Sequence, residues 1–135
     1  FVAESGALIM RVEYIKEELS RKYAILDGGM NDYVRVAMYE AYNEIMPLVK
    51  TNKYSNYDFV GPICESSDVF ANDRECETLK EGDYVALLDA GAYGFSMASN
   101  YNSRPLISQV MIDKDKHYII RKRQSFEDMI KDEII

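Results

Sequence analysis

The sequence predicts a mainly β fold, a barrel or sandwich of about six short strands with short helices and loop-rich connections. Two observations predict it: apolar residues alternate over several short segments, and polar or Gly-containing stretches separate these segments. The chain has 135 residues, of which 47% are hydrophobic and 29% are charged. This composition excludes a disordered, collagen-like or coiled-coil chain. Without an internal repeat, it predicts one structural domain over residues 1–135.

The beginning of the chain is typical of a β-hairpin. Residues 7–16 start apolar and then alternate, which predicts a strand with one shared face formed by Met10, Val12 and Tyr14. A polar stretch over residues 17–22 turns the chain, and residues 23–26 form the second strand. An Asp-Gly-Gly stretch then ends the hairpin.

The middle of the chain has a weaker pattern. Residues 33–39 are ambiguous, because the spacing of their aromatic residues also suits a helical turn. Alternation returns over residues 42–49, where Pro47 suits an edge strand. A polar loop over residues 50–56 precedes a short apolar strand over residues 58–63.

The last third of the chain predicts a strand, a hairpin and a helix. Residues 83–88 form a short apolar strand, and residues 106–112 and 117–123 pair as a second hairpin. The segment from Ser125 to Asp128 resembles a capping box with Asp in place of the usual Glu or Gln. It is followed by an apolar stripe, so we expect a short final helix.

The charge balance excludes several classes of partner. The chain has 16 Lys and Arg against 23 Asp and Glu, a net charge of −7. Nucleic-acid binders normally carry a basic face, so we expect no nucleic-acid partner. The longest purely apolar run, residues 7–10, is far shorter than the ~20 residues of a membrane helix, so we expect no membrane partner. The chain starts at Phe1 without an initiator Met or a leader, which indicates a mature product or a piece of a longer protein.

The cysteine content also limits the chemistry. Cys64 and Cys76 do not form a disulfide scaffold, and free thiols fit a cytoplasmic location. With a single His they cannot supply a standard four-ligand zinc site, so no metal site is predicted. The charged residues 73–75 indicate that Cys76 lies in a loop.

Two segments combine residues that can carry chemistry. Residues 61–68, Gly-Pro-Ile-Cys-Glu-Ser-Ser-Asp, place a thiol directly before a carboxylate, and such a thiol can serve as a proton donor. The structural alternative for this segment is a buried cysteine followed by a polar turn. Residues 89–96 place Gly91 and Gly94 around Tyr93, whose hydroxyl can contact an anion such as a phosphate. A tight turn with a packed Tyr is the alternative.

Arg35 and Tyr39 form a third candidate group. They are four residues apart, so on a helical turn they share one face. The guanidinium group can bind a carboxylate through two parallel hydrogen bonds, and Tyr adds a hydroxyl donor. A surface Arg stacked on a Tyr is the structural alternative.

Taken together, these segments resemble the diaminopimelate decarboxylase family. The matching stretches are Gly29-Met-Asn-Asp with Arg35 and Tyr39, the Cys-Glu-Ser stretch of residues 61–68, and residues 89–105 with Ala-Tyr-Gly-Phe. They occur in the order in which that family has them. The resemblance covers nearly the whole chain but only the carboxy-terminal part of the enzyme.

The resemblance implies a two-domain enzyme of the alanine-racemase-like fold that uses pyridoxal 5'-phosphate. This chain would be its carboxy-terminal domain, a Greek-key-type β-barrel like that of alanine racemase. The amino-terminal (β/α)-barrel, which is absent from this chain, would carry the cofactor lysine. The family implies a homodimer whose active sites lie at the interface and which converts meso-diaminopimelate into L-lysine and CO₂. We therefore expect the chain by itself to be inactive.

The same resemblance implies a role for each candidate residue. Cys64 would be the proton donor, and Glu65 would bind the distal ammonium group of the substrate. Arg35 and Tyr39 would bind the distal carboxylate, and Tyr93 would contact the cofactor and the substrate.

Two alternatives stay open at this stage. The first is a related decarboxylase acting on ornithine, arginine or carboxynorspermidine. Glu65 together with Arg35 and Tyr39 argues for a substrate with both a distal ammonium and a distal carboxylate group. The second is a non-catalytic β-barrel module for dimerisation, against which the intact set of candidate residues argues.

Overall fold

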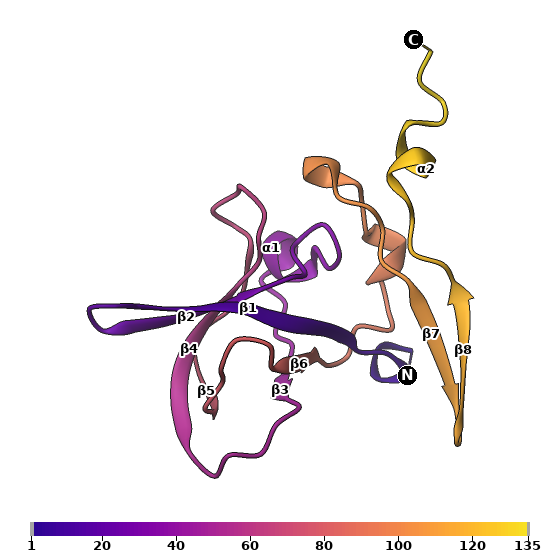
Figure 1. Cartoon of the computed structure of the whole chain (residues 1–135). Helices are drawn as coiled ribbons and strands as arrows, with labels where there is room; N and C mark the ends of the chain where they lie inside the picture. Colours follow the sequence, from indigo (N-terminus) through magenta and orange to yellow (C-terminus); the bar gives the residue numbers. More distant parts are fainter. Residues whose placement is uncertain (1, 135) are drawn as a thin grey trace. The chain divides into compact units, whose positions relative to one another are not determined.

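The computed structural model describes residues 2–134 (Figure 1). The chain divides into two compact units, one ending at Ala98 and the other beginning at Ser99. The first unit contains a six-stranded sheet, and the second contains a two-stranded sheet. The mainly β class that the sequence predicts is therefore confirmed.

The first unit consists of six strands with one short α-helix and two 3-10 turns among its described residues. In chain order these are the 3-10 turn Ala3–Ser5, β1 (Leu8–Glu18), β2 (Arg21–Leu26), α1 (Arg35–Tyr39), β3 (Ile45–Pro47), β4 (Tyr54–Val60), β5 (Val69–Glu77), β6 (Tyr84–Leu87) and the 3-10 turn Phe95–Met97. The strand order is β3-β6-β1-β2-β4-β5. All neighbouring strands are antiparallel except β2 and β4, which are parallel. The outermost strands β3 and β5 contact each other, so the sheet is a nearly closed barrel.

Strand alternation places the core inside this barrel. Along β1, Leu8, Met10 and Val12 are buried, whereas the residues between them are exposed. The alternation ends at a register shift between Val12 and Tyr14, and Tyr14 is 53% exposed. The expectation that Tyr14 shares one face with Met10 and Val12 was therefore wrong, because a β-bulge changes the face of every residue that follows it.

The predicted elements of the first half are present with different ends. The first two strands form the predicted hairpin, residues 35–39 form the helical turn, and Pro47 lies in the edge strand β3. The loop predicted over residues 50–56 was partly wrong, since β4 already begins at Tyr54 and ends at Val60. Pairing with β5 supplies backbone hydrogen bonds to this polar stretch, which outweighs its low local strand propensity.

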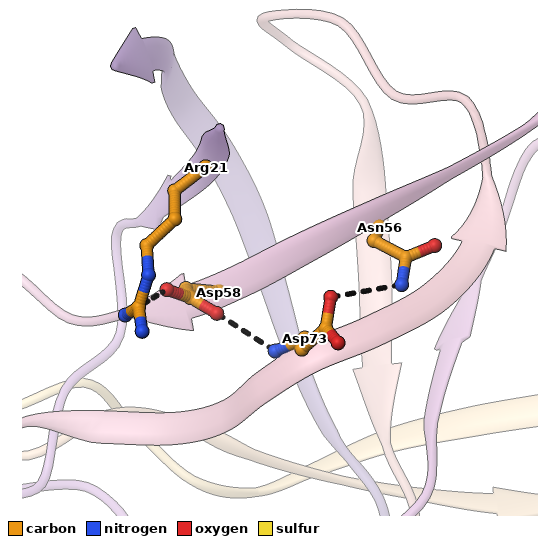
Figure 2. A network of polar contacts seen from close by, with 4 residues as sticks. All are labelled: Arg21, Asn56, Asp58 and Asp73. Atoms are coloured by element: carbon orange, nitrogen blue, oxygen red, sulfur yellow. Dashed lines mark hydrogen bonds and ion pairs between the residues drawn. The ribbon is translucent and has the colours of Figure 1, made fainter. Parts of the chain in front are cut away.

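A buried carboxylate holds the paired strands β4 and β5 at an irregular point of their register (Figure 2). Asp58 accepts hydrogen bonds from the backbone N–H of Asp73 at 2.7 Å and from the guanidinium of Arg21 at 3.1 Å. Asn56 in turn donates to the carboxylate of Asp73 at 2.8 Å. The guanidinium is largely exposed, so solvent screens the ion pair and it contributes little to stability. The backbone hydrogen bond fixes the local geometry.

The second unit contains the predicted carboxy-terminal hairpin. A 3-10 turn (Tyr101–Ser103) precedes β7 (Gln109–Asp113) and β8 (Lys116–Arg121), which pair antiparallel, and α2 (Phe126–Ile130) follows. The capping box is confirmed: Asp128 N–H donates to the Ser125 hydroxyl at 3.1 Å, and Ser125 N–H donates to the Asp128 carboxylate at 2.9 Å. Among residues 2–134, the helices are all too short or too polar to cross a membrane.

Cys76 lies in β5, so the loop expected around it was wrong. Its side chain is only 7% exposed, and burial raises the pKa of its thiol from 9.0 to about 11. The polar residues before it are characteristic of a strand with one solvent-facing side, which resembles a loop in composition. Cys64, by contrast, is exposed, and neither cysteine forms a disulfide.

This difference predicts selective thiol labelling in the full-length protein. At pH 8, iodoacetamide should alkylate Cys64 readily and spare Cys76, because about one thiol in a thousand is ionised when the pKa is near 11. Peptide mass spectrometry measures both sites, and labelling in denaturant, where both should react, is the control. Equal rates in the native protein would contradict the burial of Cys76.

Candidate active site

The turn between β4 and β5 carries the thiol and the carboxylate that the sequence pairs. Cys64 and Glu65 are both exposed on this turn. The Glu65 carboxylate accepts hydrogen bonds from the Ser66 hydroxyl at 3.2 Å and from the Ser67 N–H at 3.4 Å. These bonds orient the Glu65 carboxylate on the turn. The exposed Cys64 removes the alternative of a buried cysteine followed by a polar turn.

A buried carboxylate, Asp68, fixes the base of this turn. Its side chain accepts hydrogen bonds from the backbone N–H of Ile63 at 2.7 Å and of Met30 at 2.6 Å. Its backbone carbonyl also accepts from Gly61 N–H at 2.9 Å. Met30 lies in the loop that runs from β2 to α1, so Asp68 connects that loop to the turn with Cys64.

Arg35 begins α1 and lies against two aromatic rings. Its guanidinium carbon is 5.6 Å from the ring centroid of Tyr39 and 5.4 Å from that of Tyr93. Tyr39 lies one helical turn later, as the spacing predicts. It is the last residue of α1 and is followed by Glu40, which is left-handed with φ 52°. A guanidinium stacked on aromatic faces keeps its N–H groups at the ring edges available for a carboxylate.

Tyr93 adopts an unusual backbone conformation. Its φ is 58°, in the left-handed region that bulky residues rarely occupy. The neighbouring glycines are required by close packing, because a Cβ at Gly91 would collide with the Val2 carbonyl and one at Gly94 with the Ala90 carbonyl. The Tyr93 side chain itself is 63% exposed. Strain of this kind is concentrated at functional sites.

Arg35 and Tyr93 also line a pocket of about 280 Å³, together with Ala3, Tyr33, Ala41, Tyr42, Asn43, Asp89 and Ala92. Asn43 is buried and donates hydrogen bonds to the Tyr33 hydroxyl at 3.1 Å and to the Leu88 carbonyl at 2.8 Å. Sequence reasoning missed Tyr33, Asn43 and Asp89 as lining residues. No local pattern marks them, since the pocket assembles from four separate stretches of the chain.

The five predicted site residues thus fall into two groups. Cys64 and Glu65 occupy the β4–β5 turn, and Arg35, Tyr39 and Tyr93 gather beside α1. Within residues 2–134, the acidic, Cys and His side chains form no group of three or more that could hold a metal ion. The described side chains therefore offer a thiol and a carboxylate on one exposed turn, and a cationic group flanked by phenols.

The sequence pattern of the C-terminal sheet domain of pyridoxal-dependent decarboxylases matches residues 2–91. The chain belongs to this family. Its sheet domain is the nearly closed barrel described above. Cys64, Glu65, Arg35 and Tyr39 lie inside the matched range, and Tyr93 lies just beyond it.

Two curated relatives of this decarboxylase sheet domain carry the same name. Diaminopimelate decarboxylase of Zymomonas mobilis is 46% identical over 132 residues, which are 98% of this chain and 31% of that protein. The diaminopimelate decarboxylase of Haemophilus influenzae is also 46% identical, over 94% of this chain and 31% of its own length. The chain thus spans about a third of the curated relatives that it matches.

Solved structures agree with this assignment to the decarboxylase family. A crystal structure of diaminopimelate decarboxylase from M. jannaschii superposes with a TM-score of 0.96 at 42% identity and covers 98% of this chain and 31% of its own. The enzyme from Helicobacter pylori, crystallised with L-lysine, gives a TM-score of 0.90 at 44% identity, over 96% of this chain and 32% of its own.

Proposed function

We propose that this chain is the C-terminal β-barrel domain, over residues 1–135, of a diaminopimelate decarboxylase. The longer protein would convert meso-diaminopimelate into L-lysine and CO₂, the last step of lysine biosynthesis. The observation that carries this proposal is the stacking of Arg35 against Tyr39 and Tyr93 at the wall of a pocket. A substrate with a carboxylate at its distal end needs such a receptor, and a decarboxylase of simple diamino acids does not.

The residues of this chain would bind the distal end of the substrate. Arg35 donates two parallel hydrogen bonds to the distal carboxylate, and the Tyr39 hydroxyl adds a third donor. Glu65 accepts from the distal ammonium group, and its orientation is set by the hydrogen bonds from Ser66 and Ser67. Binding both charges at fixed positions orients the opposite end of the substrate for reaction.

Cys64 would then deliver the proton that completes the reaction. Loss of CO₂ leaves an electron pair on the α-carbon, and a thiol held at one face can protonate that carbon. The exposed position of Cys64 on the β4–β5 turn allows it to face a substrate bound outside this chain's core.

Pyridoxal 5'-phosphate supplies an electron sink for the α-carbon when it is bound. Tyr93 fits a contact with this group, because its exposed phenol lies on a glycine-flanked turn that lets the backbone approach closely. The lysine that binds the cofactor covalently is proposed to lie outside residues 1–135, in an amino-terminal (β/α)-barrel. Residues 1–135 alone are accordingly inactive in this proposal.

The same proposal assigns the remaining partners. The protein is a homodimer whose active sites combine residues from both subunits, and its ligand is a small amino acid. A cytoplasmic location agrees with the two free thiols, one of them exposed.

Turnover of the full-length protein on several substrates tests the assignment. We expect meso-diaminopimelate to be decarboxylated with a kcat/KM at least about 10²-fold above ornithine, arginine or carboxynorspermidine, because only the first can pair with Arg35 through a distal carboxylate. Faster turnover of ornithine would overturn the substrate. A protein that binds pyridoxal 5'-phosphate but turns over none of the four would favour the non-catalytic dimerisation module.

A further inference from the structure

We propose that Asp68 is a positioning residue, which holds the Cys64 turn in its working geometry by clamping it to the loop between β2 and α1. Asp68 touches neither substrate nor cofactor in this proposal and acts through the backbone on either side of it. The inference rests on the proposed proton-donor role of Cys64, and the experiments below separate the two.

The hydrogen bonds of Asp68 reach both halves of the candidate site. One carboxylate oxygen accepts from Ile63 N–H at 2.7 Å, and Ile63 directly precedes Cys64. The other oxygen accepts from Met30 N–H at 2.6 Å, in the loop that leads to Arg35. A single side chain therefore ties the turn with the thiol to the loop that precedes the carboxylate receptor.

Close packing against two glycines restricts the Asp68 carboxylate to one position. A Cβ on Gly61 would lie 2.5 Å from Oδ1 of Asp68 and closer still to Oδ2, so only glycine leaves room there. A Cβ on Gly29 would lie 3.1 Å from Oδ2, which is also tight. Asp68 is 3% exposed, so solvent cannot replace its hydrogen bonds without opening the turn.

An amide at position 68 keeps the shape of the side chain but not its function as a double acceptor. One of its two terminal atoms is an NH₂ group, which must face either the Ile63 or the Met30 N–H, and two donors repel each other. The turn and the loop would then separate locally. A shift of about 1 Å at a reacting group can reduce a rate by ~10²-fold, so a partial shift should be measurable.

The first experiment is Asp68→Asn in the full-length protein with pyridoxal 5'-phosphate and meso-diaminopimelate. We expect kcat to fall about tenfold or more, and KM to rise as well, because the displaced turn carries Glu65 next to Cys64 in the sequence. The solvent deuterium isotope effect on kcat should rise, since a misplaced thiol makes proton delivery slower than the other steps. A simple loss of folded protein would lower the rate without changing that isotope effect.

Asp83→Asn is the matched control. Asp83 is also a buried carboxylate, 8% exposed, and accepts a backbone hydrogen bond from Lys80 N–H at 2.9 Å. It lies in the turn before β6, outside the proposed catalytic and binding groups. We expect a lower midpoint of thermal unfolding for this variant, with kcat and the isotope effect of wild type.

Gly61→Ala provides a second variant if Asp68→Asn folds poorly. The added methyl group displaces the carboxylate without removing it, so the same fall in kcat and rise in isotope effect should appear. Wild-type kcat in folded Asp68→Asn, or equal losses in Asp68→Asn and Asp83→Asn, would overturn the positioning role. Cys64→Ala with wild-type turnover would instead overturn the proton-donor proposal on which this inference rests.

Discussion

Replacing Cys64 by Ala in the full-length protein is expected to lower kcat by about 10²-fold or more. A positioned general acid contributes typically ~10²–10⁴-fold, and Ala offers no exchangeable proton at this position. The turn itself should survive, because the Asp68 hydrogen bonds to Ile63 and Met30 do not involve the thiol. Cofactor absorbance should therefore be that of the wild type, and steady-state turnover of meso-diaminopimelate measures the loss.

The matched control for Cys64→Ala is Cys76→Ala. It removes a thiol of the same size from the core strand β5, where the side chain is 7% exposed. We expect it to cost on the order of 1 kcal/mol of unfolding free energy through the small cavity that it leaves, with turnover close to wild type. Near-wild-type turnover of Cys64→Ala would remove Cys64 from the mechanism.

Replacing Arg35 by Lys is expected to lower kcat/KM roughly 5- to 150-fold. This corresponds to a loss of about 1–3 kcal/mol of transition-state stabilisation. Lysine keeps the positive charge but loses the planar fork that binds a carboxylate through two parallel bonds. It also loses the flat contact with Tyr39 and Tyr93, whose rings lie 5.6 and 5.4 Å from the guanidinium carbon. Steady-state kinetics with meso-diaminopimelate measure this effect.

Arg21→Lys is the control for this substitution. Arg21 also makes a charged contact, with Asp58 at 3.1 Å, but it lies at the start of β2 outside the proposed receptor (Figure 2). Its kinetics should equal those of wild type. If kcat/KM of Arg35→Lys is unchanged as well, Arg35 has only the structural role of packing between two tyrosines.

Local sequence patterns were sufficient for several elements. The β1–β2 hairpin, the β7–β8 hairpin and the capping box at Ser125 each depend on residues close together in the chain. Alternation, turn residues and a side chain that reaches three residues ahead are all visible in a short window. The same holds for Arg35 and Tyr39, which one helical turn brings together.

Other features could not be predicted from a short stretch of sequence. β5 resembles a loop in composition, and only pairing with β4 makes it a strand and buries Cys76. The bulge after Val12 exposes Tyr14, although the alternation of apolar residues places it on the same face as Met10 and Val12. In both cases the partner strand decides the outcome, because backbone hydrogen bonds and burial outweigh the weak propensity of a short segment.

The sequence by itself determined the β class, most strand positions and the residue types that can bind charges or donate a proton. Only the tertiary structure decided that Tyr93 joins Arg35, and that Asp68 ties the Cys64 turn to the loop before α1. These contacts join segments that are far apart in the chain. They form because closing the barrel brings loops from different strands together, and no short-range pattern encodes that closure.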